Sequence, residues 1–170
     1  HAAHRCVGPR SCASSTLRSF RLALCRVDRR RRAVHVASGP SMIFGIGVDV
    51  LEAKRVALVH EKYGERFVER LLMPAEREQL GKTARPQRFL AMRFAAKEAI
   101  VKAMGTGFAH GVWIRDVGVV QNAWGRPEVV YSPRGEAVRR GLGVGEGHVT
   151  LTDEAGLIVA VAVLMKAGAG

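Results

Sequence analysis

The sequence predicts an α+β fold in which a small antiparallel sheet packs against one long central helix. Apolar residues recur at helical spacing across residues 86–104, which is typical of a helix with one buried face. Short apolar runs separated by turn-forming residues follow in the last third of the chain and favour strands. The 170 residues suffice for one domain with a sizeable core, which we expect to span residues 42–166 and to leave a short tail at 167–170.

Residues 1–41 differ in composition from the rest of the chain. They hold nine arginines against one aspartate, a net charge of +8, whereas the whole chain carries +12. Three interpretations stay open: translated sequence upstream of a true start at Met42, an organelle transit peptide, or a basic arm that binds anionic polymers. We expect this basic N-terminal extension to be disordered or non-native. Because most of the positive charge lies there, the net charge does not indicate a nucleic-acid-binding domain.

Cysteine usage and hydropathy exclude two further classes of protein. The three cysteines all lie within residues 1–41 and none belongs to a CxxC pair, so we expect neither a disulfide framework nor a zinc site. No apolar run approaches the roughly 20 residues that a membrane-spanning helix requires, so we expect no membrane segment.

The first half of the predicted domain begins with a strand. Residues 43–50 are apolar with glycines at alternate positions, which predicts a buried strand closely approached by another backbone or by a ligand. Residues 51–73 have a helical apolar spacing that is interrupted near Gly64. Pro74 then begins a short helix that we expect to end at Leu80.

The longest predicted helix runs from Pro86 to Met104. One stripe of this helix is apolar except for a single lysine, and its members are Leu90, Phe94, Lys97, Val101 and Met104. Gly105 supplies the C-terminal stop, and Gly107 keeps the following loop tight.

The last third of the domain predicts two hairpins and a helix. Residues 117–132 are expected to pair around a turn at 122–127. A helix is expected over 133–141. Residues 148–164 are then expected to form a second hairpin around a turn at 153–156.

Two carboxylates are candidate metal ligands. Asp49 lies within an apolar strand, where a carboxylate is costly unless a cation or several hydrogen-bond donors satisfy it, and backbone donors at a strand end are the plain alternative. Glu98 is placed to form an ordinary helix pair with Lys102, four residues later. Alanines flank Glu98, however, and such small side chains indicate close approach by another group. Two carboxylates together suit Mg²⁺, which binds carboxylate oxygens.

Arg93 and Lys97 place two positive charges side by side on the long helix. Like charges at this spacing repel each other unless an anion lies between them; a phosphate would suit, and repulsion tolerated in water is the alternative. Gly105-Thr106-Gly107 lacks the lysine-serine ending of a P-loop, and no GxSxG sequence indicates a hydrolase. Paired carboxylates and bases suited to phosphates favour phosphoryl-type transfer.

Four blocks of the sequence resemble bacterial holo-acyl-carrier-protein synthases, the short type of 4′-phosphopantetheinyl transferase. Residues 44–52 are similar to the GIG-x-D-[IV]-x-E opening of that family, and residues 88–107 to its RFLAxRFAAKEA…KAxGTG block. Arg115-Asp116-Val117 and Gly125-Arg126-Pro127 resemble its FRDIEV and G-[KR]-P elements. The similarity is collinear over about residues 42–166.

The resemblance implies a reaction and the residues that perform it. Members of this family transfer 4′-phosphopantetheine from coenzyme A to a serine of apo-acyl carrier protein and release adenosine 3′,5′-bisphosphate, which serves fatty acid biosynthesis. Asp49 and Glu98 match the family's Mg²⁺ ligands, and Lys102 matches its active-site lysine. The positions implied to bind coenzyme A are matched by Arg85, Arg93, Lys97, Gly105, Thr106, Gly107, Gly125, Arg126 and Pro127.

The resemblance also implies partners and a location. The family enzyme is a homotrimer with its sites between subunits, and we expect it to be cytoplasmic and to bind neither nucleic acid nor membrane. Its first helix docks the acidic carrier protein through basic residues, here Arg55 with Lys62 and Arg66 as helpers. A catalytically silent homologue, or a nucleic-acid-binding protein that uses residues 1–41, is the alternative.

One position departs from the family pattern. Many members have a Ser-x-[ST]-His element whose histidine lies near the coenzyme, whereas this chain has Thr150-Leu151-Thr152-Asp153. His148 lies upstream and does not simply replace the missing histidine. We expect the acid at Asp153 to weaken phosphate binding nearby.

Overall fold

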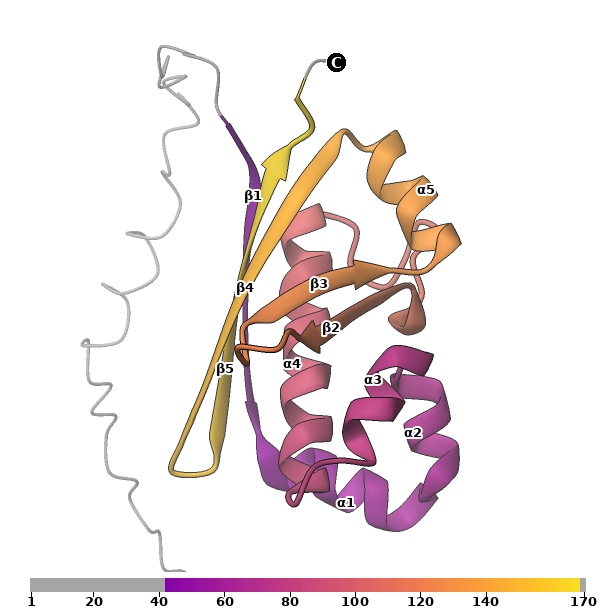
Figure 1. Ribbon diagram of the computed structural model, residues 1–170, viewed down its shortest axis with the longest axis vertical. Helices are drawn as coiled ribbons and strands as arrows, with labels where there is room; N and C mark the ends of the chain where they lie inside the picture. The colour runs from indigo at the N-terminus through magenta and orange to yellow at the C-terminus, as the bar shows by residue number, and fades with distance from the viewer. Residues whose placement is uncertain (1–41, 169–170) are drawn as a thin grey trace, which may run out of the picture. The chain divides into compact units, whose positions relative to one another are not determined.

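The computed structural model describes residues 42–168, so the basic extension at 1–41 and the last two residues of the tail lie outside the described range (Figure 1). Within that range the elements are β1 Ile43–Glu52, α1 Ala53–Tyr63, α2 Glu65–Leu71, α3 Pro74–Leu80, α4 Pro86–Met104, the 3-10 helix η1 Ile114–Asp116, β2 Val117–Gln121, β3 Pro127–Tyr131, α5 Pro133–Gly141, β4 Val144–Glu154 and β5 Leu157–Lys166. The strands form one antiparallel sheet in the order β1-β5-β4-β3-β2. The predicted α+β fold with a long central helix is confirmed.

Helix α4 lies along one face of the sheet and forms the centre of the domain (Figure 1). Helices α1, α2 and α3 gather around its first half and α5 lies toward its other end. The predicted bounds of α4 are confirmed, and Gly105 ends the helix in the left-handed conformation, at φ 76°. No helix among residues 42–168 is long and apolar enough to cross a membrane.

Strand β1 packs against α4 backbone to backbone. A Cβ atom added at Gly47 would lie 2.0 Å from the carbonyl oxygen of Ala99, and one at Gly45 would lie 2.1 Å from that of Ala103. The predicted close approach of another backbone is therefore confirmed. At Ala99 and Ala103 the helix surface is therefore covered by this strand, not by a ligand.

The prediction that β1 is buried holds for one face of the strand only. The strand lies at the edge of the sheet, and α4 covers only the face that carries its glycines, so the opposite face stays in water. Ile46, Val48 and Val50 are 60%, 48% and 56% exposed. On β5, each of them pairs with a valine, namely Val163, Val161 and Val159. These six residues form an apolar outer face of the sheet that no helix of residues 42–168 covers.

The segment after β1 folds as predicted, as two helices broken at a glycine. Gly64 has φ 53°, a value that favours glycine, and it separates α1 from α2. Helix α3 begins with Pro74 in its first turn, where a missing backbone N–H costs nothing. Leu71 and Leu72, at the end of α2, are each 1% exposed and join the core.

The β4–β5 hairpin is longer than predicted. Strand β4 begins at Val144 and continues through Asp153 and Glu154, so the turn is reduced to Ala155 and Gly156. Both turn residues have positive φ, 51° and 81°, as a tight two-residue hairpin turn requires. Asp153 consequently belongs to a strand that faces α4 and is held in a defined position.

The close contact between β1 and α4 should make the fold sensitive to any side chain added at Gly47. We expect Gly47→Ala to lower the free energy of unfolding by about 2–4 kcal/mol, because the new methyl group would overlap the Ala99 carbonyl. Urea denaturation measures the change. Gly81→Ala is the control, since its Cβ would meet nothing nearer than 3.7 Å and should change stability by less than about 0.5 kcal/mol. Equal effects of the two substitutions would contradict the packing described.

Candidate active site

Asp49, Glu98 and Lys102 come together where the inner face of β1 meets α4. Side chains alternate along a strand, so Asp49 points to the same side as the two glycines that pack on the helix. Its Oδ1 accepts a hydrogen bond of 2.7 Å from Lys102 Nζ, which also donates to the Val48 carbonyl at 3.2 Å. Lys102 therefore forms its ion pair with the strand, and the helix pair with Glu98 that the spacing allowed is not formed.

The environment of Glu98 disfavours its negative charge. Burial raises the pKa of the Glu98 carboxyl, the charge of Asp49 raises it further, and Lys102 partly opposes both effects. Asp49 and Glu98 line one cavity of about 500 Å³, which we call the carboxylate cavity. Arg55 and apolar side chains of β1, α1 and α2, together with Phe94, complete its walls. A cation between the two carboxylates would relieve the repulsion that raises the pKa.

The residues of the carboxylate cavity fit a magnesium ion. No group of three or more histidine, cysteine, aspartate and glutamate side chains is arranged for a metal among residues 42–168. Mg²⁺ commonly binds one or two carboxylates and completes its shell with water and substrate phosphates. Asp49 and Glu98 are a donor set of this kind, with open space beside them.

A second cavity, of about 240 Å³, is lined by three arginines from the start of α4. We call it the arginine cavity after Arg85, Arg88 and Arg93. Phe89 and Met92 supply apolar surface, and residues of the β2–β3 turn and of β4 close it on the other side. The structure thus brings together four of the residues that the sequence assigned to coenzyme binding, namely Arg85, Arg93, Gly125 and Pro127.

Arg93 presents a buried positive charge to the arginine cavity. Its side chain is 3% exposed, and its guanidinium lies 4.1 Å from the centre of the Phe89 ring. One Nη donates to Gln79 Oε1 at 3.2 Å, whereas Nε is buried without a hydrogen-bond partner. Burial lowers the pKa of Arg93, and Glu76, 4.0 Å from Nε, opposes this effect. An anionic ligand would offset the remaining desolvation.

The structure places Lys97, which the resemblance assigned to coenzyme binding, in the core and in the lining of neither cavity. Its side chain is fully buried, and Nζ donates to Glu76 Oε2 at 2.7 Å, to the Leu71 carbonyl at 2.7 Å and to the Ile114 carbonyl at 3.2 Å. All three ammonium protons are used, so none is left for a ligand. The anion that the Arg93–Lys97 pair requires is the carboxylate of Glu76. The like charges indicated that an anion was needed, but nothing in the sequence pointed to α3 as its source.

Gly105, Thr106 and Gly107 do not line either cavity. They follow the last residue of α4, whereas the arginine cavity lies at the first turns of this 19-residue helix. At 1.5 Å per residue, the helix separates the two by roughly 20 Å. Within one protomer, the expectation that these residues share a coenzyme cleft with the turn at Gly125 is therefore not met.

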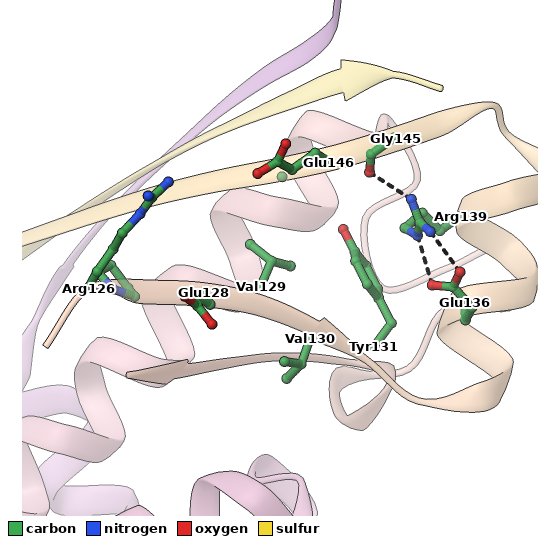
Figure 2. A pocket seen from close by; sticks show the side chains of 11 residues that line it. Arg126, Glu128, Val129, Val130, Tyr131, Glu136, Arg139, Gly145 and Glu146 are labelled. Atoms are coloured by element: carbon green, nitrogen blue, oxygen red, sulfur yellow. Dashed lines mark hydrogen bonds and ion pairs between the residues drawn. The ribbon is translucent and has the colours of Figure 1, made fainter. Parts of the chain in front are cut away.

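Arg126 lies outside the arginine cavity although its neighbours line it. Figure 2 shows its side chain beside β4, where an Nη lies 3.4 Å from His148 Nδ1. It borders a third cavity, of about 580 Å³, between β3 and β4. These strands pair only at Glu128 and His148 and then diverge, which leaves the gap.

The third cavity is a weak candidate for the active site despite its size. Arg139 pairs with Glu136 and donates to the carbonyls of Val144 and Gly145, so its charge is already satisfied (Figure 2). The Tyr131 hydroxyl is buried without a hydrogen-bond partner, and burial raises the pKa of Tyr131 to about 12. Arg126 and Glu146 lie beside His148, and Glu128 accepts a hydrogen bond from Asn122, so the remaining charged residues of this cavity have polar neighbours too.

The basic residues predicted to bind a partner lie on the surface beside the carboxylate cavity. Arg55 lines that cavity, and Arg66 lines a neighbouring one of about 290 Å³ with Arg70. Both cavities include Val59 and Phe67, so they are contiguous. The exposed Lys62 has its ammonium 5.2 Å from the Tyr63 ring centre. Together, α1 and α2 contribute to these two cavities the residues Arg55, Val59, Tyr63, Arg66, Phe67 and Arg70.

Asp153, which departs from the family pattern, forms an ion pair with Arg88 at the arginine cavity. Sequence reasoning identified Asp153 but not its partner. The hydrogen bonds from Arg88 lower the pKa of the Asp153 carboxyl, and Arg85 contributes. The acid is therefore neutralised by the protein's own arginine.

Paired carboxylates on one side of α4 and clustered arginines on another equip a protein to act on phosphorylated ligands. The chain belongs to the 4′-phosphopantetheinyl transferase superfamily, whose family model matches residues 45–153.

Individual relatives are similar over the same part of the chain. A holo-[acyl-carrier-protein] synthase of Nitrosospira multiformis is 41% identical over 125 residues, which are 74% of this chain and all of that relative. The crystal structure of the Neisseria meningitidis synthase has 36% identity and a TM-score of 0.70, over 74% of this chain and 100% of that one. The Bacillus anthracis synthase, solved in complex with CoA (3′,5′-ADP), has 33% identity and a TM-score of 0.60, over 74% and 99%.

The two lysines of α4 are expected to differ in what they contribute. Lys97→Met would leave Glu76 buried without its nearest cation, and we expect it to lower the free energy of unfolding by about 3–5 kcal/mol. Lys102→Met, at a side chain that is 48% exposed, should cost less than about 1 kcal/mol. Urea denaturation of both variants measures the difference. A Lys97→Met variant as stable as Lys102→Met would contradict the structural role of Lys97.

Proposed function

We propose that this chain is a holo-acyl-carrier-protein synthase, which transfers 4′-phosphopantetheine from coenzyme A to a serine of apo-acyl carrier protein. The single observation that carries the proposal is that Asp49 and Glu98 line one open cavity while Lys102 forms an ion pair with Asp49. The family membership and the named relatives support it. We assign the catalytic domain to residues 42–166, and the reaction to the cytoplasm and to fatty acid biosynthesis.

In the reaction, the serine hydroxyl of the carrier forms a new bond to the pantetheine-bearing phosphorus of coenzyme A. The pyrophosphate bond breaks, and adenosine 3′,5′-bisphosphate leaves with the electron pair. Mg²⁺ held by Asp49 and Glu98 would neutralise charge on the pyrophosphate and on the departing group. Lys102, already beside Asp49, is placed to bind a pyrophosphate oxygen or to handle the serine proton.

The arginine cavity is proposed to hold the nucleotide end of coenzyme A. Arg85, Arg88 and Arg93 supply the positive charge that a phosphate requires, and the Arg93 Nε, which lies 4.0 Å from Glu76 and makes no hydrogen bond, indicates unused hydrogen-bonding capacity. Phe89 and Met92 offer apolar surface against which an adenine base can pack. A cavity with charged arginines beside apolar side chains suits a ligand that carries a phosphate next to an aromatic ring.

A homotrimer would bring the two cavities into one site. The arginine and carboxylate cavities share no lining residue and draw on different faces of α4. We therefore propose that one coenzyme A lies between the arginine cavity of one protomer and the carboxylate cavity of the next. The apolar outer face of the sheet supports assembly, because a large exposed β-branched patch is typical of a subunit interface.

The carrier protein is proposed to dock on α1 and α2. Arg55, Lys62 and Arg66 offer positive charge to an acidic partner, while Val59 and Phe67 offer apolar contacts beside them. Complementary charge of this kind mainly accelerates encounter and weakens with salt. The surface borders the carboxylate cavity through Arg55, so a docked carrier would present its serine near the proposed metal ligands.

The transfer reaction tests the proposed function directly. The full chain, incubated with Mg²⁺, coenzyme A and apo-acyl carrier protein, should add the mass of one phosphopantetheine group to the carrier, as seen by mass spectrometry. Glu98→Gln should reduce the rate by at least about 100-fold, because it removes a charged metal ligand. Glu154→Gln, an exposed carboxylate at the hairpin end, is the control and should retain full activity. The proposal fails if several apo-carriers gain no mass.

Mixed assemblies test whether the site lies between subunits. Glu98→Gln and Arg93→Met chains, each inactive alone, should regain about a quarter of the wild-type activity when unfolded together in equal amounts and refolded, because mixed trimers contain one intact site each. Light scattering should give the mass of three chains. Circular dichroism of each variant checks that it is folded. Failure of the folded, mixed trimers to recover activity would show that each site belongs to one chain.

A further inference from the structure

Arg88 and Asp153 form a two-pronged ion pair between the start of α4 and the end of β4. Arg88 Nε donates to Asp153 Oδ2 at 2.7 Å, and Arg88 Nη2 donates to Oδ1. The edge of the guanidinium between Nε and Nη2 is thereby occupied. A phosphate binds arginine through the same kind of edge, so Asp153 and a phosphate would compete for it.

This ion pair lies at the rim of the arginine cavity, within reach of solvent. Arg88 lines the cavity together with Arg85 and Arg93, and its side chain is 42% exposed; that of Asp153 is 34% exposed. Ion pairs open to water contribute little net stability, because water and salt screen them. The pair can therefore open at small cost, unlike the buried contacts of Arg93 with Gln79 and Glu76.

We propose that Asp153 is a positioning residue that holds Arg88 in an exchangeable pair and thereby limits the affinity of the arginine cavity for phosphate groups. The inference deepens the proposed function and rests on it. A bound phosphate displaces the Asp153 carboxylate from Arg88, and the carboxylate reclaims the guanidinium as the phosphate leaves. For a synthase, the ligand concerned is the adenosine bisphosphate end of coenzyme A, and the pair favours release of the bisphosphate product.

The charge of the arginine cavity also indicates that Asp153 lowers its affinity for phosphate. Three arginines face the cavity and one carboxylate, Asp153, is bound to one of them, so removal of this carboxylate raises the local positive charge. A purely structural role, in which Asp153 ties the β4–β5 hairpin to α4, makes a different prediction. Loss of such a tie would lower thermal stability and would not strengthen the binding of an anion.

Calorimetric titration of the full chain with adenosine 3′,5′-bisphosphate tests the proposal. We expect Asp153→Asn to bind this ligand about two- to fivefold more tightly than the wild type at low salt, because one competing, partly exposed charge is gone. In turnover, the KM for coenzyme A should fall by a similar factor. Glu154→Gln makes the same change in net charge at the adjacent residue and should leave the affinity unchanged.

A double-substitution cycle distinguishes the release of Arg88 from the mere loss of one negative charge. In an Arg88→Gln background, Asp153→Asn should give a much smaller gain in affinity, because there is no guanidinium left to release. An undiminished gain in that background, or weaker binding by Asp153→Asn alone, would overturn the proposal. A lower melting temperature without tighter binding would assign Asp153 a structural role and overturn it as well. If the wild type binds neither coenzyme A nor the bisphosphate, the proposed function itself is wrong.

Discussion

The contact between β1 and α4 is the constraint on which the rest of the structure depends. Two glycines on the strand and two alanines on the helix let the backbones meet with no side chain between them. Asp49 follows Gly47 by two residues on the same face, so it is carried directly onto the helix beside Lys102. A larger residue at either glycine would move the strand outward and separate the proposed metal ligands. Packing and catalysis therefore share one set of small residues.

The buried ions at Glu76 position Arg93 at the arginine cavity, the proposed binding site for the nucleotide end of coenzyme A. Glu76 accepts hydrogen bonds from Lys97 and from the backbone N–H groups of Met73 and Val119, which ties α3, α4 and β2 together. Arg93 lies 4.0 Å from the same carboxylate and extends from it into the arginine cavity. Burying an ion pair gains little stability in itself, but breaking one is costly, so this network resists rearrangement. Of the two neighbouring charges on α4, Lys97 is fully buried in the fold, whereas Arg93 also lines the arginine cavity.

The sequence predicted the helices and most of the strands because their signals are local. Proline and glycine mark the ends of α4, and Gly64 marks the break between α1 and α2. Errors arose where the answer depended on a distant segment. The exposure of β1 depends on which strand pairs with it and on which side α4 lies. The role of Lys97 depends on Glu76, which lies on another helix and belongs to none of the matched motifs.

For the site, the resemblance predicted which residues take part but could not predict their arrangement. Asp49, Glu98 and Lys102 do meet, and Arg85 and Arg93 share a cavity, whereas Gly105 and Arg126 lie elsewhere in the protomer. The partner of Asp153 could not be found from sequence, because Arg88 lies on another element and no local pattern links the two. The outer face of the sheet leaves Ile46, Val48 and Val50 in water in a single chain. If the proposed trimer covers this face, dilution would favour separated chains that expose it, and specific activity in very dilute solution would then report assembly as much as chemistry.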